Sequence, residues 1–375
     1  MLEEWKIKCL VPDLPPVDEV LPYLRRMEQA RWYSNFGPLV TEFEAKIARF
    51  IADMSPAYTT APHAITFSSA TTALELLLRT AGLPEDAHIL VPGLTFSATA
   101  ACVAITGHTP VFSDIDPVTW DLTPAIARAA ADRRRIDAVL PVAIYGYPLD
   151  IDAWAAFQAE TGIPVFIDAA AALGNQPVHP EVPVVFSLHA TKPFGVGEGG
   201  LLVTADDALA DRCRRLSNFA FDDGTSRAIG TNAKMAEAMA AYGLAQIDRF
   251  SNVQARRGQV LAAYVSHLGL DHFHPKTTSH VPGTLLYDTR GTADSVDAAL
   301  TGAGIQTRKW YFPPLAEHPA FEQLEKAGTN AQGQLPVIED LKSRLVGLPF
   351  HAFLSDADVA AVCSHLPAAL PAVGR

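Results

Sequence analysis

The stretch FSLHATKPFGVGEGG, residues 186–200, contains the features that decide how this chain folds. An apolar run ends at Ser187, polar residues follow as far as Lys192, and a loop with four glycines leads into another apolar run. A lysine is normally a surface residue, but this one lies between two runs that are apolar enough to be buried strands. The glycines allow the backbone to pack closely around a ligand. A lysine in such a place loses its proton readily and can form a Schiff base with an aldehyde, so the stretch predicts a reactive Lys192 at the end of a sheet strand.

Short apolar runs of the same kind recur on both sides of this stretch. They cover residues 64–67, 88–92, 110–116, 138–146, 164–169, 183–189 and 200–204, and helix-like stretches separate most of them. Most are rich in β-branched residues and bounded by Gly, Pro or Asp, which is typical of sheet strands covered by helices on both faces. The pattern predicts an α/β fold whose large domain has a mostly parallel seven-stranded sheet.

The two ends of the chain follow other patterns. The first forty residues are rich in proline and predict an irregular arm, and a helix is expected from Thr41, where Thr41 and Glu44 match a capping box. Residues 233–268 are rich in alanine and predict one long helix. A second cluster of strand-like and helix-like stretches follows at 282–289, 295–303, 305–312, 345–350 and 356–366. A chain of 375 residues normally divides into two domains, and we expect them at 1–245 and 246–375, the second being a smaller αβ domain.

Another motif follows the predicted strand 64–67, where the sequence SSATT, residues 68–72, precedes a predicted helix. Free N–H groups at the start of a helix, together with Ser and Thr hydroxyls, form an anion site that suits a phosphate. Thr72 and Glu75 also match a capping box, and ordinary capping is the commoner use of such residues. Taken alone, the motif leaves both interpretations open.

Asp168 stands at the carboxyl end of the run 164–169, which is where ligands bind in α/β sheets. A carboxylate there can hold the protonated nitrogen of a heterocycle, although the same residue can also cap a helix. The combination of motifs favours the first interpretation. A phosphate cup, a carboxylate for a ring nitrogen and a Schiff-base lysine are, in this order, the groups that pyridoxal 5'-phosphate (PLP) requires.

The composition argues against several other classes of function. The net charge is −12, with 41 acidic against 29 basic residues, which does not favour nucleic acid or an anionic membrane as a partner. The four scattered cysteines form no CxxC pair and predict neither a disulfide framework nor a zinc site. No stretch is apolar over the length of a membrane span, and the N-terminus lacks the apolar region of a signal peptide. We therefore expect a cytoplasmic protein without a bound metal.

With these motifs in place, the sequence resembles the DegT/DnrJ/EryC1/StrS aminotransferases, PLP enzymes that act on sugars and cyclitols. The resemblance extends from SNFGP at residues 34–38 to LPF at residues 348–350, and it is most specific in SLHATK and GEGG within the stretch 187–200. It implies a PLP-dependent transferase of fold type I. By position, Lys192 matches the lysine that binds the cofactor and Asp168 matches the partner of the pyridinium nitrogen.

Further cofactor-binding positions follow from the resemblance. Ala70 and Thr71 match the phosphate-binding pair, and Ser187 matches a hydroxyl that contacts the same phosphate. Phe96 matches the aromatic residue that stacks on the ring, where stacking holds the ring flat, although a core phenylalanine is the alternative. Asn232 resembles the residue that reaches the phosphate of the neighbouring subunit, so the resemblance implies a homodimer with composite active sites.

Two positions depart from the family pattern. Family members usually have Gln or His three residues after the Asp, where it touches the ring hydroxyl, and this chain has Ala171 there. The His that often precedes the Tyr-Gly pair is missing from AIYG, residues 143–146. Some family members that dehydrate their substrate rather than transaminate it carry His at the lysine position, so Lys192 favours transamination.

The resemblance implies transfer of an amino group from glutamate to a nucleotide-linked keto-deoxy sugar, a step of amino-sugar biosynthesis. The sequence RKWY, which includes Arg308 and Tyr311, suits a diphosphate beside a flat base, or else it is a strand with alternating exposed charges. Tyr33 and Asn35 either meet the hexose or anchor a loop, and His189 either contacts a substrate or is a hydrogen-bonded core histidine. Two other functions stay open: an aminotransferase for a keto-cyclitol or another carbocycle, and a PLP-binding regulatory protein without turnover.

Overall fold

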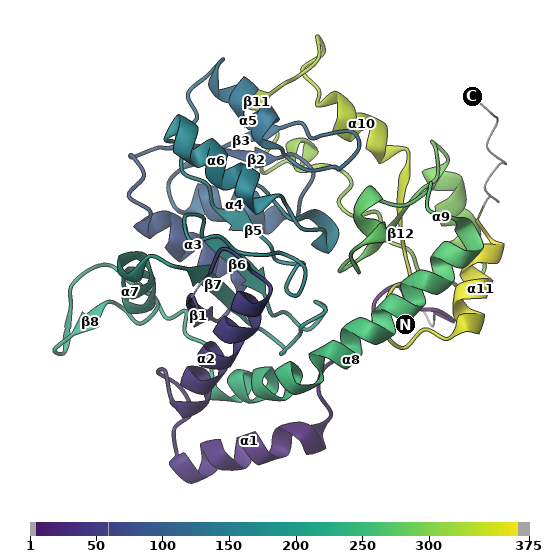
Figure 1. Ribbon diagram of the computed structural model, residues 1–375. Helices are drawn as coiled ribbons and strands as arrows, with labels where there is room; N and C mark the ends of the chain where they lie inside the picture. Colours follow the sequence, from purple (N-terminus) through teal and green to yellow (C-terminus); the bar gives the residue numbers. More distant parts are fainter. Residues whose placement is uncertain (1–4, 59, 367–375) are drawn as a thin grey trace.

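All seven predicted strands are present in the computed structural model, which describes residues 5–58 and 60–366 (Figure 1). The strands of the large domain are β1 (His63–Phe67), β2 (His88–Pro92), β3 (Thr109–Ser113), β4 (Ala138–Val139), β5 (Ile167–Asp168), β6 (Val184–Ser187) and β7 (Gly200–Thr204). β7 runs antiparallel to both of its neighbours, β1 and β6, and every other pair in the sheet is parallel. The prediction of an α/β fold with a mostly parallel sheet is thus confirmed.

The sheet consists of two ladders that meet along β4 and β5. One ladder has the order β1-β7-β6-β5, and the other has the order β11-β3-β2-β4, where β11 is Lys326–Ala327. Parallel bridges from Val139 to Val165 and from Val142 to Asp168 join the two. Side chains alternate between two apolar layers, because Leu90 packs in one core cluster while Ile89 and Val91 pack in the other.

Eleven α-helices surround the sheet and build the smaller unit within the described residues (Figure 1). They are α1 (Val17–Ala30), α2 (Pro38–Asp53), α3 (Ala70–Thr80), α4 (Ser97–Ile105), α5 (Pro124–Ala131), α6 (Ile151–Thr161), α7 (Asp207–Leu216), α8 (Glu237–Leu268), α9 (Ala293–Gly302), α10 (Pro336–Lys342) and α11 (Asp356–Ser364). Residues of α2, α5, α6 and α8 belong to one core cluster, and residues of α3, α4, α7 and α10 belong to the other. None of the described helices is both long and apolar enough to cross a membrane.

The start of α2 differs from the prediction. The helix begins at Pro38 with Gly37 as its N-cap, so Thr41 and Glu44 lie inside the first turns and form no capping box. Glu44 is buried instead, and its carboxylate accepts hydrogen bonds from the Thr66 N–H and hydroxyl at 2.8 and 2.9 Å. A spacing of three residues between Thr and Glu does not distinguish a cap from a tertiary contact.

Three other boundaries also differ. The N-terminal arm is not irregular throughout, because α1 occupies its middle; the first four residues lie outside the described part. At α3 the N-cap is Ser69, whose partner in the capping box is Thr72, so the predicted Thr72 and Glu75 pair is wrong. The long helix begins at Glu237, and the segment 233–236 is extended toward it. α8 continues through the predicted domain boundary at residues 245 and 246.

The smaller unit has a two-stranded antiparallel sheet of β10 (Leu285–Asp288) and β12 (Leu345–Leu348). The C-terminal half of α8, α9 and α11 cover it and share a core that includes Tyr264 and Tyr287. Residues 305–312 do not form the expected strand. Only single bridges occur there, from Ile305 to Ile7 and from Arg308 to Gly347, because the chain then turns and packs Trp310, Tyr311 and Phe312 against the core of the large sheet.

The region after residue 312 returns to the large sheet. β11 pairs in parallel with β3, and Leu335, Ile338 and Leu341 of the α10 region pack in the large sheet's core. A strand of two residues leaves no periodic signal in the sequence. The remaining short elements are the hairpin β8 (Phe221–Asp222) and β9 (Thr225–Ser226) and three 3-10 turns, Ile144–Gly146, Pro275–Thr278 and Leu315–Glu317.

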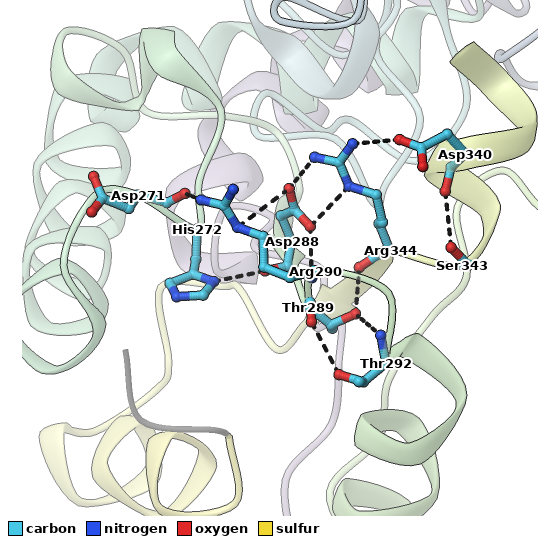
Figure 2. A network of polar contacts seen from close by, with 9 residues as sticks. All are labelled: Asp271, His272, Asp288, Thr289, Arg290, Thr292, Asp340, Ser343 and Arg344. Carbon is cyan, nitrogen blue, oxygen red and sulfur yellow. Dashed lines mark hydrogen bonds and ion pairs between the residues drawn. The ribbon is translucent and has the colours of Figure 1, made fainter. Parts of the chain in front are cut away.

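A polar network ties α10 to the smaller sheet (Figure 2). Arg344, just before β12, binds both oxygens of Asp288 at the end of β10 and also binds Asp340 of α10. Around it, Thr289 accepts from the Thr292 N–H at 3.0 Å, and the Arg290 N–H donates to Asp288 at 2.9 Å. Arg290, Arg344, Asp288 and Asp340 each face an opposite charge, as is expected of a contact that holds two parts of the fold together.

Candidate active site

The register of three strands brings the two most distinctive motifs together. Gly200 of β7 pairs with Phe67 of β1 on one side and with Ser187 of β6 on the other. Since α3 starts just after Phe67, Ser187 lies beside the start of that helix. A Cβ at Gly200 would collide with the backbone of Ser69 and Ala70, so a glycine is required for this close approach.

The start of α3 leaves donors free. The Ser69 hydroxyl accepts from the Thr72 N–H at 3.1 Å, while the N–H groups of Ala70 and Thr71 find no acceptor in the described part of the chain. Among the residues that the structure describes, the Ser187 hydroxyl oxygen accepts only the His189 N–H, at 3.2 Å. Free helix N–H groups with an adjacent hydroxyl are the donor set of a phosphate site, so these residues fit the phosphate of PLP.

Asp168 is buried and Lys192 is half-buried beside this cup. The Asp168 carboxylate accepts from the Thr99 hydroxyl at 2.8 Å and from the Ala170 N–H at 3.1 Å. Burial raises the pKa of Asp168, and the hydrogen bond from Thr99 opposes that shift. Burial lowers the pKa of Lys192, which favours the neutral amine that Schiff-base chemistry needs, and the attraction of Asp168 opposes this shift.

Three aromatic rings border the same space. Phe96, at the N-cap of α4, is 60% exposed, so it is not a core phenylalanine and its ring is free to stack on a ligand. The Tyr311 ring lies 6.0 Å from Phe96 and 5.8 Å from Tyr145, nearly parallel to the latter. The Tyr145 hydroxyl donates to the Trp310 carbonyl at 2.7 Å and so ties the segment from the smaller unit to the large one.

Two adjoining cavities meet at Lys192. The first, which we call the cofactor cavity, contains the predicted residues Ala70, Thr71, Phe96 and Asp168, and also Thr95, Ala143 and Tyr145. The second, which we call the substrate cavity, is lined by Leu10, Thr191, Pro193, Gly283, Thr284, Gln306, Arg308 and Trp310. Ala171, Lys192 and Tyr311 line both. A group bound in the first cavity would therefore meet a substrate in the second at Lys192.

Five predicted site residues, Ser187 among them, line neither cavity. Tyr33 and Asn35 are exposed in the turn before α2, and Asn232 is exposed and accepts from the Lys234 amine at 2.7 Å. His189 bonds to the Thr191 hydroxyl at 2.8 Å and lies 3.5 Å from Glu198, so it is neither a core histidine nor a lining residue.

Sequence reasoning missed Thr99, whose hydroxyl donates to Asp168, and several lining residues. Thr99 lies one helical turn after Phe96, and this spacing is the signal that could have found it. Leu10, Thr284 and Gln306 come from the arm and the smaller unit and carried no motif. Among the described residues there is no group of three His, Cys, Asp or Glu side chains that suits a metal ion.

A family model, the DegT/DnrJ/EryC1/StrS aminotransferase family, matches residues 17–367. The chain belongs to this family. It is thus a PLP-dependent aminotransferase of fold type I, as the resemblance implied, and the free donors of the cup, the buried carboxylate and the half-buried lysine all fit that cofactor.

Individual relatives agree over nearly the whole chain. The UDP-2-acetamido-2-deoxy-3-oxo-D-glucuronate aminotransferase of Pseudomonas aeruginosa is 32% identical, with 88% of this chain and 90% of the relative covered. The GDP-perosamine synthase of Caulobacter vibrioides is 30% identical, with 94% and 98% covered. Among solved structures, DesI in the presence of its TDP-sugar product is 34% identical with a TM-score of 0.82, covering 95% of this chain and 91% of DesI.

Proposed function

We propose that this aminotransferase moves an amino group from glutamate to a nucleotide-linked keto-deoxy sugar in amino-sugar biosynthesis. The observation that carries the proposal is the pair of cavities that meet at Lys192, since one has the donor set for PLP and the other is open to a second molecule. Relatives whose names specify UDP-linked, GDP-linked or TDP-linked sugars support the substrate class.

Each residue in and beside the cofactor cavity would have a separate role in binding PLP. PLP, when bound, supplies an electron sink for the bonds at the reacting carbon. The free N–H groups of Ala70 and Thr71 and the Ser187 hydroxyl would hold its phosphate, and Phe96 would cover one ring face. Asp168 would hold a proton on the ring nitrogen, and the positive charge gained there offsets the desolvation of the carboxylate.

Lys192 would carry the proton transfers. Because burial lowers the pKa of its amine, Nζ can take a proton from the donor's Cα and return one in the acceptor half-reaction. Tyr145 and Tyr311 close the junction between the two units and keep water from the reacting atoms.

A screen of nucleotide-linked keto sugars against the pyridoxamine-loaded protein tests the substrate class. We expect amination of one nucleotide-linked keto-deoxy sugar and poor amination of the same sugar without its nucleotide, because the remote binding energy is lost. Efficient amination of a free keto-cyclitol, with nucleotide sugars inert, would establish the carbocyclic alternative. Loading with glutamate but no turnover with any acceptor would favour a regulatory protein.

We also propose a cytoplasmic homodimer in which Asn232 reaches the cofactor phosphate of the neighbouring subunit. Asn232 lies on the surface outside its own cofactor cavity, and the β8–β9 hairpin and the residues that flank it carry the exposed side chains Phe219, Phe221 and Ile229. Mixing Lys192→Ala with Asn232→Ala subunits should restore some sites that contain both native residues. Mixed dimers with no activity beyond the separate variants, or a monomer in solution, would refute the shared site.

A further inference from the structure

The substrate cavity contains a set of hydrogen-bond donors around one cation. Within the described part of the chain, its only charged lining residues are Lys192, which the cofactor engages, and Arg308. The Arg308 backbone is held in a two-way bridge with Gly347, at 3.1 and 2.7 Å, while its guanidinium has no ion pair with any described residue. The cavity therefore offers one uncommitted positive charge.

Two neutral residues complete the donor set. The Gln306 side-chain oxygen accepts the Cys9 N–H at 3.1 Å, which leaves its amide NH₂ as the free end. The Thr284 hydroxyl is buried without a hydrogen-bond partner among the described residues, although its residue lines the cavity and its N–H is fixed to the Tyr145 carbonyl at 3.1 Å. A guanidinium fork beside an amide and a hydroxyl matches the oxygens of a carboxylate.

The number of free cations in the substrate cavity favours a carboxylate over a diphosphate as its ligand. The sequence RKWY contains two cations, but Lys309 forms an ion pair with Asp294 and does not line the cavity. A diphosphate carries more than one negative charge, whereas a carboxylate carries a single one, which Arg308 alone balances.

Resting on the proposed function, we propose that Arg308, assisted by Gln306 and Thr284, binds the α-carboxylate of the amino donor. That carboxylate is attached to the carbon that bears the amine, and the amine must reach Lys192, so the group has to lie in the cavity that Lys192 lines. Arg308 is then a donor-specificity residue, and the nucleotide of the acceptor binds elsewhere.

The test compares glutamate with 4-aminobutanoate, which lacks the α-carboxylate, and with 2-aminobutanoate, which lacks the distal one. The half-reaction of each donor is followed by absorbance in the wild type, Arg308→Ala, Arg308→Lys and the control Lys309→Ala, with bound cofactor and circular dichroism as checks of folding. Arg308→Ala should lower the efficiency of the glutamate half-reaction by about 10- to 100-fold, the range for a lost charged hydrogen bond. It should also abolish the preference for glutamate over 4-aminobutanoate. Arg308→Lys should retain part of the preference and Lys309→Ala all of it, with the acceptor KM unchanged throughout.

Other outcomes would overturn the assignment in distinguishable ways. A normal glutamate half-reaction with a raised acceptor KM in Arg308→Ala would assign Arg308 to the diphosphate. Loss of the preference over 2-aminobutanoate alone would assign it to the distal carboxylate. A wild-type protein that responds to none of the three amino acids would refute the proposed function, and the inference with it.

Discussion

Asp288 and Asp168 each lie near a cation, but their surroundings shift the two carboxylate pKa values in opposite directions. In the network of Figure 2, Arg344 binds both oxygens of Asp288, and although burial alone raises the pKa of Asp288, the hydrogen bonds lower it overall. In the cofactor cavity, the buried Asp168 and the half-buried Lys192 form no hydrogen bond with each other, and desolvation raises the pKa of Asp168 and lowers that of Lys192. The first pair stabilises the fold, while the second keeps both groups available for a third molecule.

The largest effect is expected when Lys192 is removed. Lys192→Ala deletes both the Schiff-base partner and the base, so the half-reaction should slow by at least about 10⁴-fold, the upper end for a single acid–base group. Borohydride reduction of wild-type protein should place the cofactor label on Lys192, as mass spectrometry of its peptides can check. Label on another lysine would contradict the assignment.

Asp168→Asn tests the other half of the same pair. The amide keeps the shape but loses the charge that holds a proton on the ring nitrogen, so turnover should fall about 100-fold or more, roughly 2.7 kcal/mol of barrier, while PLP affinity changes far less. Stopped-flow rates with glutamate and fluorescence titration of PLP measure the two quantities. Equal losses in both would mean that Asp168 mainly binds the cofactor.

The sequence predicted these two residues because each stands at a strand end with a local motif around it. The family resemblance predicted Ser187, Ala70 and Thr71 as phosphate contacts, and the pairing of Gly200 with both Phe67 and Ser187 places the end of β6 near the start of α3. The substrate cavity was less predictable, because Leu10, Thr284 and Gln306 meet only through packing between the arm and the smaller unit. The helix starts at α2 and α3 were misplaced by a turn or less. At α3 several nearby hydroxyls compete for the same cap, and at α2 the N-cap is Gly37, which has no capping side chain.

Breaking the ion pair between Arg344 and Asp288 should lower the stability of the fold and leave the glutamate half-reaction unchanged. Arg344→Met leaves Asp288 buried with weaker partners, so the free energy of unfolding should fall by about 2 kcal/mol, as for a lost charged hydrogen bond, with the glutamate half-reaction kept. The midpoint of urea unfolding gives the first quantity. A large loss of half-reaction rate in a folded variant would show that the network also shapes the site.

The smallest effect concerns pH and stability. Because the pKa of Asp168 is raised in the folded state, its charge destabilises the fold at neutral pH, and this penalty disappears as the pH falls below the unfolded-state pKa. Cofactor-free Asp168→Asn should therefore unfold at higher urea than wild type at pH 7, with the gain shrinking on acidification. Because the pKa of Asp288 is lowered in the folded state, its charge stabilises the fold at neutral pH, and this stabilisation is lost as the pH falls through the folded-state pKa. The loss of unfolding free energy in Arg344→Met should therefore also become smaller in acid. Urea midpoints from about pH 2 to about pH 8 check both signs, because the stability from Asp288 is lost only below the ordinary Asp pKa of 3.8. A cofactor-free Asp168→Asn protein that is less stable than wild type at pH 7 would contradict the first.

The edge strand β11 has a consequence for how the chain is made. A ribosome releases β3 long before it reaches Lys326, so the growing large sheet keeps its β3 edge open until almost the whole chain has emerged. An unpaired edge invites association with other strands during that interval. We therefore expect nascent chains that stop before residue 326 to depend on chaperones, and the newly made enzyme to become resistant to proteases only once its last segment has returned to the first-made sheet.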